Sequence, residues 1–173
     1  MGELVYDGFL KIELIESEIK GKTVKREKLL MKNSVAGILK NELGLYCLVK
    51  QYRPVVGDYF YEMPAGICDK EGLSNIEILV EEIEEECEIS KEGILDIRYV
   101  IDYFMAIGFS DAKLFIYEVD VKGTDSSLKY VEDTDVESIE WFELSEIDVL
   151  IKEGKIKDNK TILMYNYLIA NLK

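Results

Sequence analysis

The segment from Ser74 to Ile89 most constrains the fold, because it reads as an amphipathic helix with an unusual charged side. Ser74 and Glu77 have the spacing of a capping box, which predicts that the helix begins at this point. Apolar residues then recur at helical spacing, namely Ile76, Leu79, Val80, Ile83 and Cys87. This stripe predicts that one side of the helix packs against a core.

Glutamates crowd the other sides of this helix, and no lysine or arginine lies between Glu71 and Lys91. Glutamates four residues apart on a helix repel one another, at a cost of about 0.2–0.5 kcal/mol per pair. Glu82, Glu85 and Glu86 share one face, and carboxylate oxygens are suitable ligands for Mg²⁺ or Mn²⁺. Two interpretations stay open: a divalent-cation site, or an acidic helix that is merely solvated.

Composition and charge argue against several classes of function. The chain has 173 residues, of which 48% are hydrophobic, and this predicts a single domain over residues 1–173 with a buried core. A net charge of −14 argues against binding to DNA or RNA, and the absence of histidine excludes Ser-His triads and His-based zinc sites. The widely spaced Cys47, Cys68 and Cys87 indicate reduced thiols.

The sequence predicts a protein without a membrane partner. No apolar run reaches the length of a membrane-spanning helix, and the first residues lack the basic and apolar regions of a signal peptide. We therefore expect a cytoplasmic location.

The order of the predicted elements indicates a mixed α/β fold. Residues 1–32 read as antiparallel strands with a hairpin turn at 19–23, and further strands precede and follow the glutamate helix. Two more helices are predicted near the C-terminus, the last starting at Asp158 or Asn159. This order lacks regular βαβ alternation.

Several motifs resemble those of the Nudix hydrolases. Glu62-Met-Pro-Ala-Gly66, a loop and the glutamate helix are similar to the Nudix box. Further motifs in the same order resemble the ADP-ribose pyrophosphatase branch: Gln51-Tyr-Arg-Pro54, Gly108-Phe-Ser-Asp111 and residues 154–161. The resemblance implies a Nudix-type α/β/α sandwich with a mixed sheet and an N-terminal antiparallel strand region. It also implies a homodimer, with residues 1–32 as the dimerisation region and 33–173 as the catalytic core.

The resemblance implies metal-dependent hydrolysis of the diphosphate linkage in a nucleoside diphosphate sugar. ADP-ribose is the leading substrate, and its products are AMP and a sugar phosphate. The metal ligands of the family fall on Glu82, Glu85, Glu86 and the backbone carbonyl of Ala65. Bound Mg²⁺ or Mn²⁺ would neutralise the diphosphate and orient the attacking water.

The resemblance also assigns residues to the substrate. Arg53 is expected to meet a phosphate, because arginine pairs well with phosphate oxygens. Glu62 is placed in the same substrate site, and Arg26 with Glu27 matches residues that contact the adenosine half, often from the partner subunit. Asp111 is the candidate catalytic carboxylate of the loop motif.

Three departures from the family pattern keep a second function open. The arginine of the box is Glu81, its second glycine is Glu88, and the catalytic glutamate of the loop motif is Ala112. Alanine can serve neither as a base nor as a metal ligand. The alternative is a catalytically impaired Nudix-fold module that binds a nucleotide or a partner without turnover.

Overall fold

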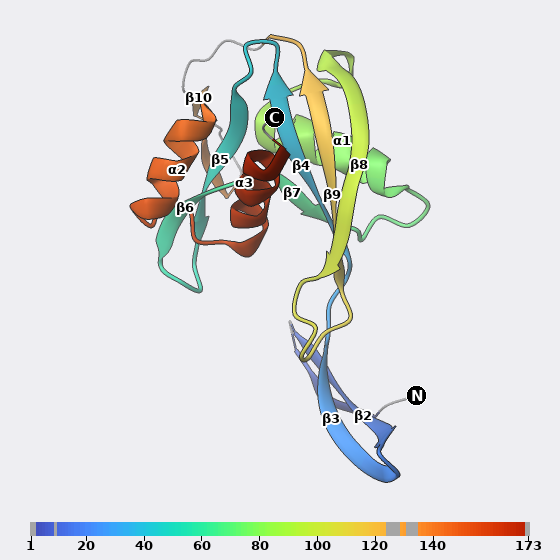
Figure 1. Cartoon of the computed structure of the whole chain (residues 1–173). Coiled ribbons are helices and arrows are strands. Elements are labelled where there is room, and N and C mark those ends of the chain that lie inside the picture. The colour runs from blue at the N-terminus through green and yellow to red at the C-terminus, as the bar shows by residue number, and fades with distance from the viewer. Residues whose placement is uncertain (1–2, 9, 124–128, 131–134, 172–173) are drawn as a thin grey trace.

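The computed structural model describes residues 3–8, 10–123, 129–130 and 135–171, which form an α/β core and a projecting N-terminal arm (Figure 1). The strands of the core are β4 (Ser34–Asn41), β5 (Tyr46–Arg53), β6 (Asp58–Glu62), β7 (Ala65–Ile67), β8 (Ile94–Phe104), β9 (Lys113–Val121), β10 (Lys129–Tyr130) and β11 (Val136–Phe142). The helices are α1 (Asn75–Cys87), the 3₁₀ turn η1 (Lys91–Gly93), α2 (Leu144–Lys152) and α3 (Asn159–Asn171).

The core is built around one mixed sheet. Its strands lie in the order β10-β11-β5-β4-β9-β8, with β6 paired to β5 and β7 paired to β4. The neighbours β4 and β9 run parallel, whereas β5, β7 and β11 form antiparallel pairs. The predicted α/β/α sandwich with a mixed sheet and an N-terminal antiparallel region is therefore confirmed.

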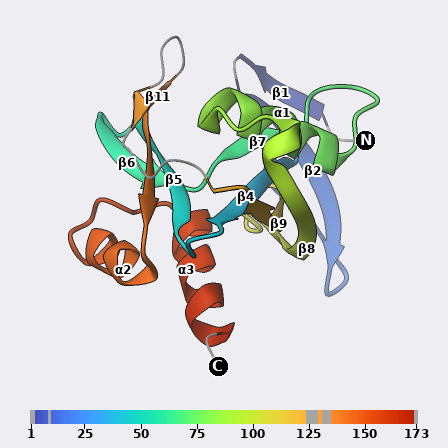
Figure 2. The same cartoon turned by 90° about the horizontal axis from the view of Figure 1, so that it is seen from above.

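Helices cover both faces of the sheet, as Figure 2 shows for α1 and α3. Successive residues of a strand point to opposite faces, and β4 follows this rule with a fully buried apolar run. Val35 and Leu39 pack on the side of α1, and Ala36 and Ile38 pack on the side of α2 and α3. Burial on both faces explains why this strand reads as continuously apolar rather than alternating.

Helix α1 begins where the sequence predicts. The Ser74 hydroxyl accepts a hydrogen bond from the Glu77 amide at 3.3 Å, and the Glu77 carboxylate accepts one from the Ser74 amide at 2.8 Å. The predicted apolar stripe is wrong at its start: Ile76 is 44% exposed and Ile78 is buried instead. The buried line consists of Leu79, Ile83 and Cys87, spaced four residues apart, and Ile78 lies beside it.

The cysteines are free thiols, as predicted. Cys47 on β5 and Cys87 on α1 are buried, and their sulfur atoms lie 4.0 Å apart. None of the helices within the described residues is long and apolar enough to cross a membrane.

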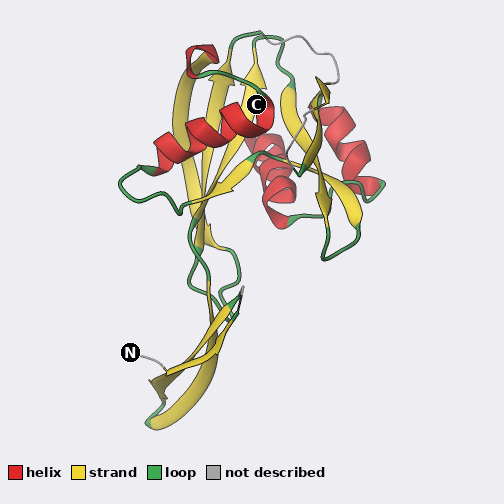
Figure 3. Ribbon diagram, turned by 180° about the vertical axis from the view of Figure 1, so that it is seen from behind, coloured by secondary structure: helices red, strands yellow, loops and turns green. Residues whose placement is uncertain are grey.

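Strands β1 (Glu3–Asp7), β2 (Lys11–Ile19) and β3 (Lys22–Leu30) form an antiparallel sheet of their own, called the arm below. Figures 1 and 3 show it projecting away from the core. Its hairpin turns through Lys20 and Gly21, both with positive φ, as expected for a two-residue turn between twisted strands. The amide of Leu29 donates to the carbonyl of Phe109 at 2.8 Å and joins the arm to the core.

The arm exposes apolar side chains that a single sheet layer cannot cover. Leu4, Tyr6, Leu10 and Leu30 are each 38–56% exposed, and Phe109 at the junction is 56% exposed. Residues 3–30 carry six acidic and six basic side chains, so the arm is neutral in a chain of net charge −14. Exposed apolar surface of this kind favours association with a second copy. The dimerisation region stays a prediction.

We expect the double substitution Leu4→Asp and Leu30→Asp to convert a dimer into a monomer, because it places charges on the arm surface. Light scattering coupled to size-exclusion chromatography measures the mass directly. The matched control is Leu43→Asp, which is 71% exposed in the turn after β4 at the other end of the core. An unchanged mass for the arm variant would contradict arm-mediated dimerisation.

Candidate functional site

A buried carboxylate at the end of β6 is the centre of the candidate site. Glu62 is only 3% exposed and accepts two hydrogen bonds from Arg53, from Nε at 2.7 Å and from Nη2 at 2.6 Å. Lys160, near the start of α3, also donates to Glu62. Burial alone would raise the pKa of Glu62, but the hydrogen bonds from Arg53 and Lys160 outweigh it and hold this pKa below its ordinary value.

The start of α3 fixes this cluster in place. Asp158 accepts a hydrogen bond from the Thr161 amide at 3.1 Å, as an N-cap residue does, and pairs with Lys160 at 3.0 Å. The Thr161 hydroxyl accepts a hydrogen bond from the Met63 amide at 2.9 Å. The segment after β6 and the first turn of α3 therefore position each other.

Two glutamates of α1 face strand β7. Glu82 and Glu86 follow Ile78 at intervals of four residues, so they lie along the edge of the buried side of the helix. The Ala65 amide donates to the Glu86 carboxylate at 3.1 Å. A Cβ added to Gly66 would lie 2.0–2.2 Å from the carboxylate end of Glu82, so only glycine allows this close approach.

The environment of these two carboxylates disfavours their charged forms. Burial is the main cause that raises the pKa of Glu86 to about 7, with repulsion from Glu82 adding to it and the Ala65 amide opposing it. Burial also raises the pKa of Glu82, followed by repulsion from Glu85. A bound cation would reverse both effects, since it would favour ionised carboxylates.

The third predicted ligand is oriented differently. The Glu85 side chain is 62% exposed, and its carboxylate lies 3.6 Å from the ammonium of Lys70, which also pairs with Glu81. Among the described residues, no three acidic or cysteine side chains form a complete metal-binding group. Glu82 and Glu86 thus fit a hard cation by their chemistry, and Glu85 would have to leave Lys70 to join them.

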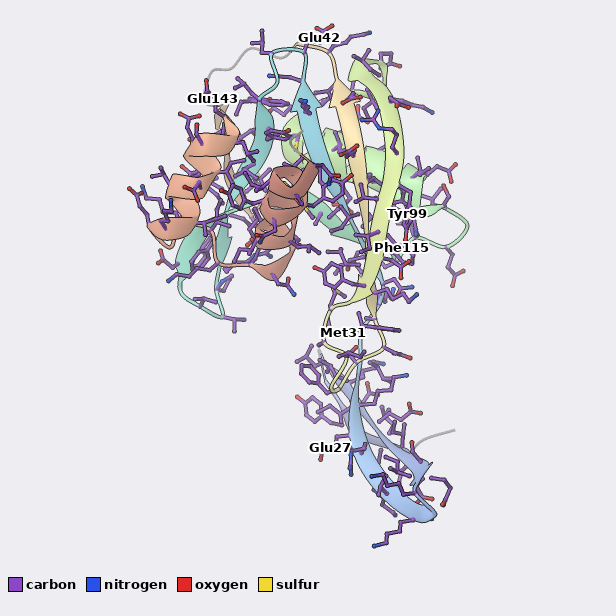
Figure 4. All side chains as sticks on the ribbon, viewed as in Figure 1. Glu27, Met31, Glu42, Tyr99, Phe115 and Glu143 are labelled. Carbon is purple, nitrogen blue, oxygen red and sulfur yellow. The ribbon has the colours of Figure 1, made fainter. Side chains whose placement is uncertain are left out.

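Three other predicted residues do not join the carboxylates within one chain. Arg26 and Glu27 lie on β3 of the arm, where Arg26 donates to the carbonyl of Lys25 and Glu27 is exposed (Figure 4). Asp111 pairs with Lys28 of the arm at 2.5 Å, and this pairing lowers the pKa of Asp111. The roles predicted for these residues stay predictions.

Sequence reasoning missed the residues that complete the cluster around Glu62. Lys160 and Asp158 belong to the segment 154–161, which was singled out only as a motif and given no chemical role. Lys160 pairs with a residue 98 positions away, so nothing near it in the sequence marks the contact. Lys70, which binds Glu81 and Glu85, had no signal of its own.

Comparison with known proteins corrects the expected identity. No family model matches the chain. The curated proteins include the methanol dehydrogenase activator of Bacillus methanolicus, which is 28% identical over 169 residues, covering 96% of this chain and 89% of the relative. The identification as an ADP-ribose pyrophosphatase-like Nudix hydrolase is therefore wrong, because this end-to-end relative carries the name of an activator and not of a hydrolase.

Proposed function

We propose that this chain is a regulatory module with a Nudix-type fold that binds a partner protein and raises that partner's activity. The observation that carries the proposal is the similarity to a methanol dehydrogenase activator over 96% of the chain, arm and core included. By analogy, the proposed partner is an alcohol dehydrogenase. The proposal corresponds to the predicted module that binds without turnover.

The electrostatics of the site support binding over catalysis. Arg53, the expected phosphate ligand, is already engaged by both oxygens of the buried Glu62. Ala112 replaces the catalytic glutamate of the loop motif and is 2% exposed, so it contributes packing only. Asp111 is held by Lys28. Each of these positions already makes a structural contact, and this supports a module that binds without turnover.

The experiment is a rate measurement on an alcohol dehydrogenase from the same organism. Adding the purified chain is expected to raise the initial rate of alcohol oxidation until the effect saturates. A heat-denatured sample of the chain serves as the first control, and the Leu4→Asp, Leu30→Asp variant tests whether the arm takes part. A rate that stays constant over all chain concentrations would refute the proposed regulatory function.

A second candidate function is metal-dependent hydrolysis of a diphosphate linkage in a nucleotide-type substrate. The convergence of Glu82 and Glu86 on β7 favours it, because burial raises the pKa of both carboxylates although cations lie near them, and a bound divalent cation would favour their charged forms. Incubating the chain alone with Mn²⁺ and nucleoside diphosphate sugars separates the two functions. Nucleotide release without a dehydrogenase, lost in Glu86→Gln, would establish the hydrolase.

A further inference from the structure

A cavity of about 500 Å³ opens beside the Arg53–Glu62 pair, between the β5–β6 hairpin and the connection from α2 to α3. Its apolar wall consists of Pro54, Val55, Val56 and Phe60. This volume is within the range of small-molecule sites in proteins, which is roughly 300–1,000 Å³. The cavity therefore has the size and the lining of a ligand site.

Both sides of the cavity are held in place by hydrogen bonds. The carbonyl of Arg53 accepts from the amides of Val56 at 2.9 Å and Gly57 at 2.8 Å, so the hairpin turn has a defined shape. On the opposite side, the Tyr61 amide donates to the carbonyl of Lys155 at 2.9 Å and ties the α2–α3 connection to β6. The exposure of Val55 and Val56, which is 101% and 67%, is thus a feature of a fixed turn.

Lysine 157 supplies a positive charge at this cavity. The ammonium of Lys157 lies 5.6 Å from the centre of the Phe60 ring, and no ion pair joins it to a carboxylate within the described part of the chain. Gly154 has a φ of +71°, and a Cβ added to it would lie 3.0 Å from Lys157 Cε. A glycine at this position therefore allows the side chain of Lys157 to lie against the α2–α3 connection.

The charges around the cavity favour an anion. Arg53 and Lys157 line the cavity together with the carboxylates of Glu62 and Asp158. Glu62 pairs with Arg53 and with Lys160, which does not line the cavity, and Asp158 pairs with Lys160. Lys157 is therefore the cation at this cavity whose charge no carboxylate of the lining neutralises. We infer that the cavity binds a small amphipathic organic anion, with its apolar body on Val56 and Phe60 and its phosphate or carboxylate on Lys157. This inference does not depend on the proposed regulatory function.

Titration of the chain with phenyl phosphate tests the inference. Binding is monitored by the amide chemical shifts in NMR spectra and by calorimetry. EDTA is present throughout, so that no cation on Glu82 or Glu86 contributes to binding. Benzoate replaces the phosphate by a carboxylate, benzyl alcohol removes the charge, and inorganic phosphate removes the apolar body. We expect phenyl phosphate and benzoate to bind at the cavity, and the other two probes to bind about tenfold more weakly or not at all.

The decisive variant is Lys157→Met, which removes the ammonium and keeps the apolar stem. This variant is expected to lower the affinity for phenyl phosphate about tenfold, which is the effect of losing one hydrogen bond to a charged group. The matched control is Lys155→Met, because Lys155 is exposed, lies two residues away and pairs with Glu153 outside the cavity. Equal affinity in both variants, absence of binding at millimolar concentration, or shifts located on the arm would each overturn the inference.

Discussion

Replacing Glu86 by glutamine is expected to stabilise the protein by about 3 kcal/mol at pH 8 in the absence of divalent cations. Burial raises the pKa of this carboxyl from its ordinary value of 4.5 to about 7. Ionising Glu86 in the folded protein is therefore harder than in the unfolded chain. Glutamine keeps the shape, can still accept the hydrogen bond of the Ala65 amide, and carries no charge.

The pH dependence gives this prediction its direction. A group whose folded pKa is raised favours the folded state while it holds its proton, and it loses that advantage as the pH rises through the folded value. The gain from Glu86→Gln should therefore vanish near pH 4, grow between pH 4.5 and 7, and stay constant above pH 8. Urea denaturation at several pH values in EDTA measures it.

Glu84→Gln is the matched control, because Glu84 is exposed on the same helix. It removes one negative charge from α1 without removing a buried one, so its effect should stay within about 0.5 kcal/mol at every pH. If Glu86→Gln and Glu84→Gln show the same pH profile, burial of Glu86 is not what raises its pKa. Added Mn²⁺ should raise the stability of the wild type, and it should not raise the stability of the Glu86→Gln variant.

The position of the acidic helix could be predicted from the sequence, but which of its glutamates face the sheet and which face solvent could not. The capping pattern of Ser74 and Glu77 is local, so it predicts the start of α1 correctly. Periodicity places Glu82, Glu85 and Glu86 on one face without fixing how that face is rotated toward the sheet. The structure aligns Glu82 and Glu86 with the buried Ile78, and Glu85 lies one position round the helix, beside Lys70.

The end of the same helix shows how a departure from a pattern becomes understandable only in the structure. Glu88 occupies the place of a glycine in the resembled motif, and it adopts a left-handed conformation with a φ of 54°. Glycine adopts this conformation without steric cost, whereas a residue with a Cβ does not. The backbone shape that the motif requires is thus retained although the residue that favours it is absent.

Ion pairs between residues far apart in the sequence are the second feature that the sequence alone could not predict. Arg53 and Glu62 lie on paired neighbouring strands, so their proximity could be expected once the β5–β6 hairpin was recognised. Lys160 reaches Glu62 across 98 residues, and only the packing of α3 against the sheet brings the two together. The sequence therefore suggested a phosphate-binding arginine, whereas the fold shows an arginine committed to a buried carboxylate.

Replacing Glu62 by glutamine is expected to destabilise the protein by about 3–5 kcal/mol at pH 7, the cost of breaking a buried ion pair by removing one partner. The change removes a carboxylate that is only 3% exposed and that Arg53 and Lys160 share as counter-charge, which leaves the 12% exposed Lys160 with Asp158 alone. For a domain of this size, such a loss lowers the melting temperature by roughly 10 °C or more. Thermal and urea denaturation of the purified variant measure both quantities.

Two comparisons separate this prediction from a general sensitivity to charge removal. Glu153→Gln breaks the exposed pair with Lys155, and surface pairs contribute about 0–1 kcal/mol, so this variant should resemble the wild type. The folded pKa of Glu62 is lowered, so its contribution is present above its ordinary value of 4.5 and is lost as the pH falls through the folded value. The deficit of Glu62→Gln should thus shrink on acidification, the reverse of the profile expected for Glu86→Gln. Opposite pH profiles from two glutamates of one site would show that cations outweigh burial at Glu62 and that burial outweighs them at Glu86, and parallel profiles would contradict that arrangement.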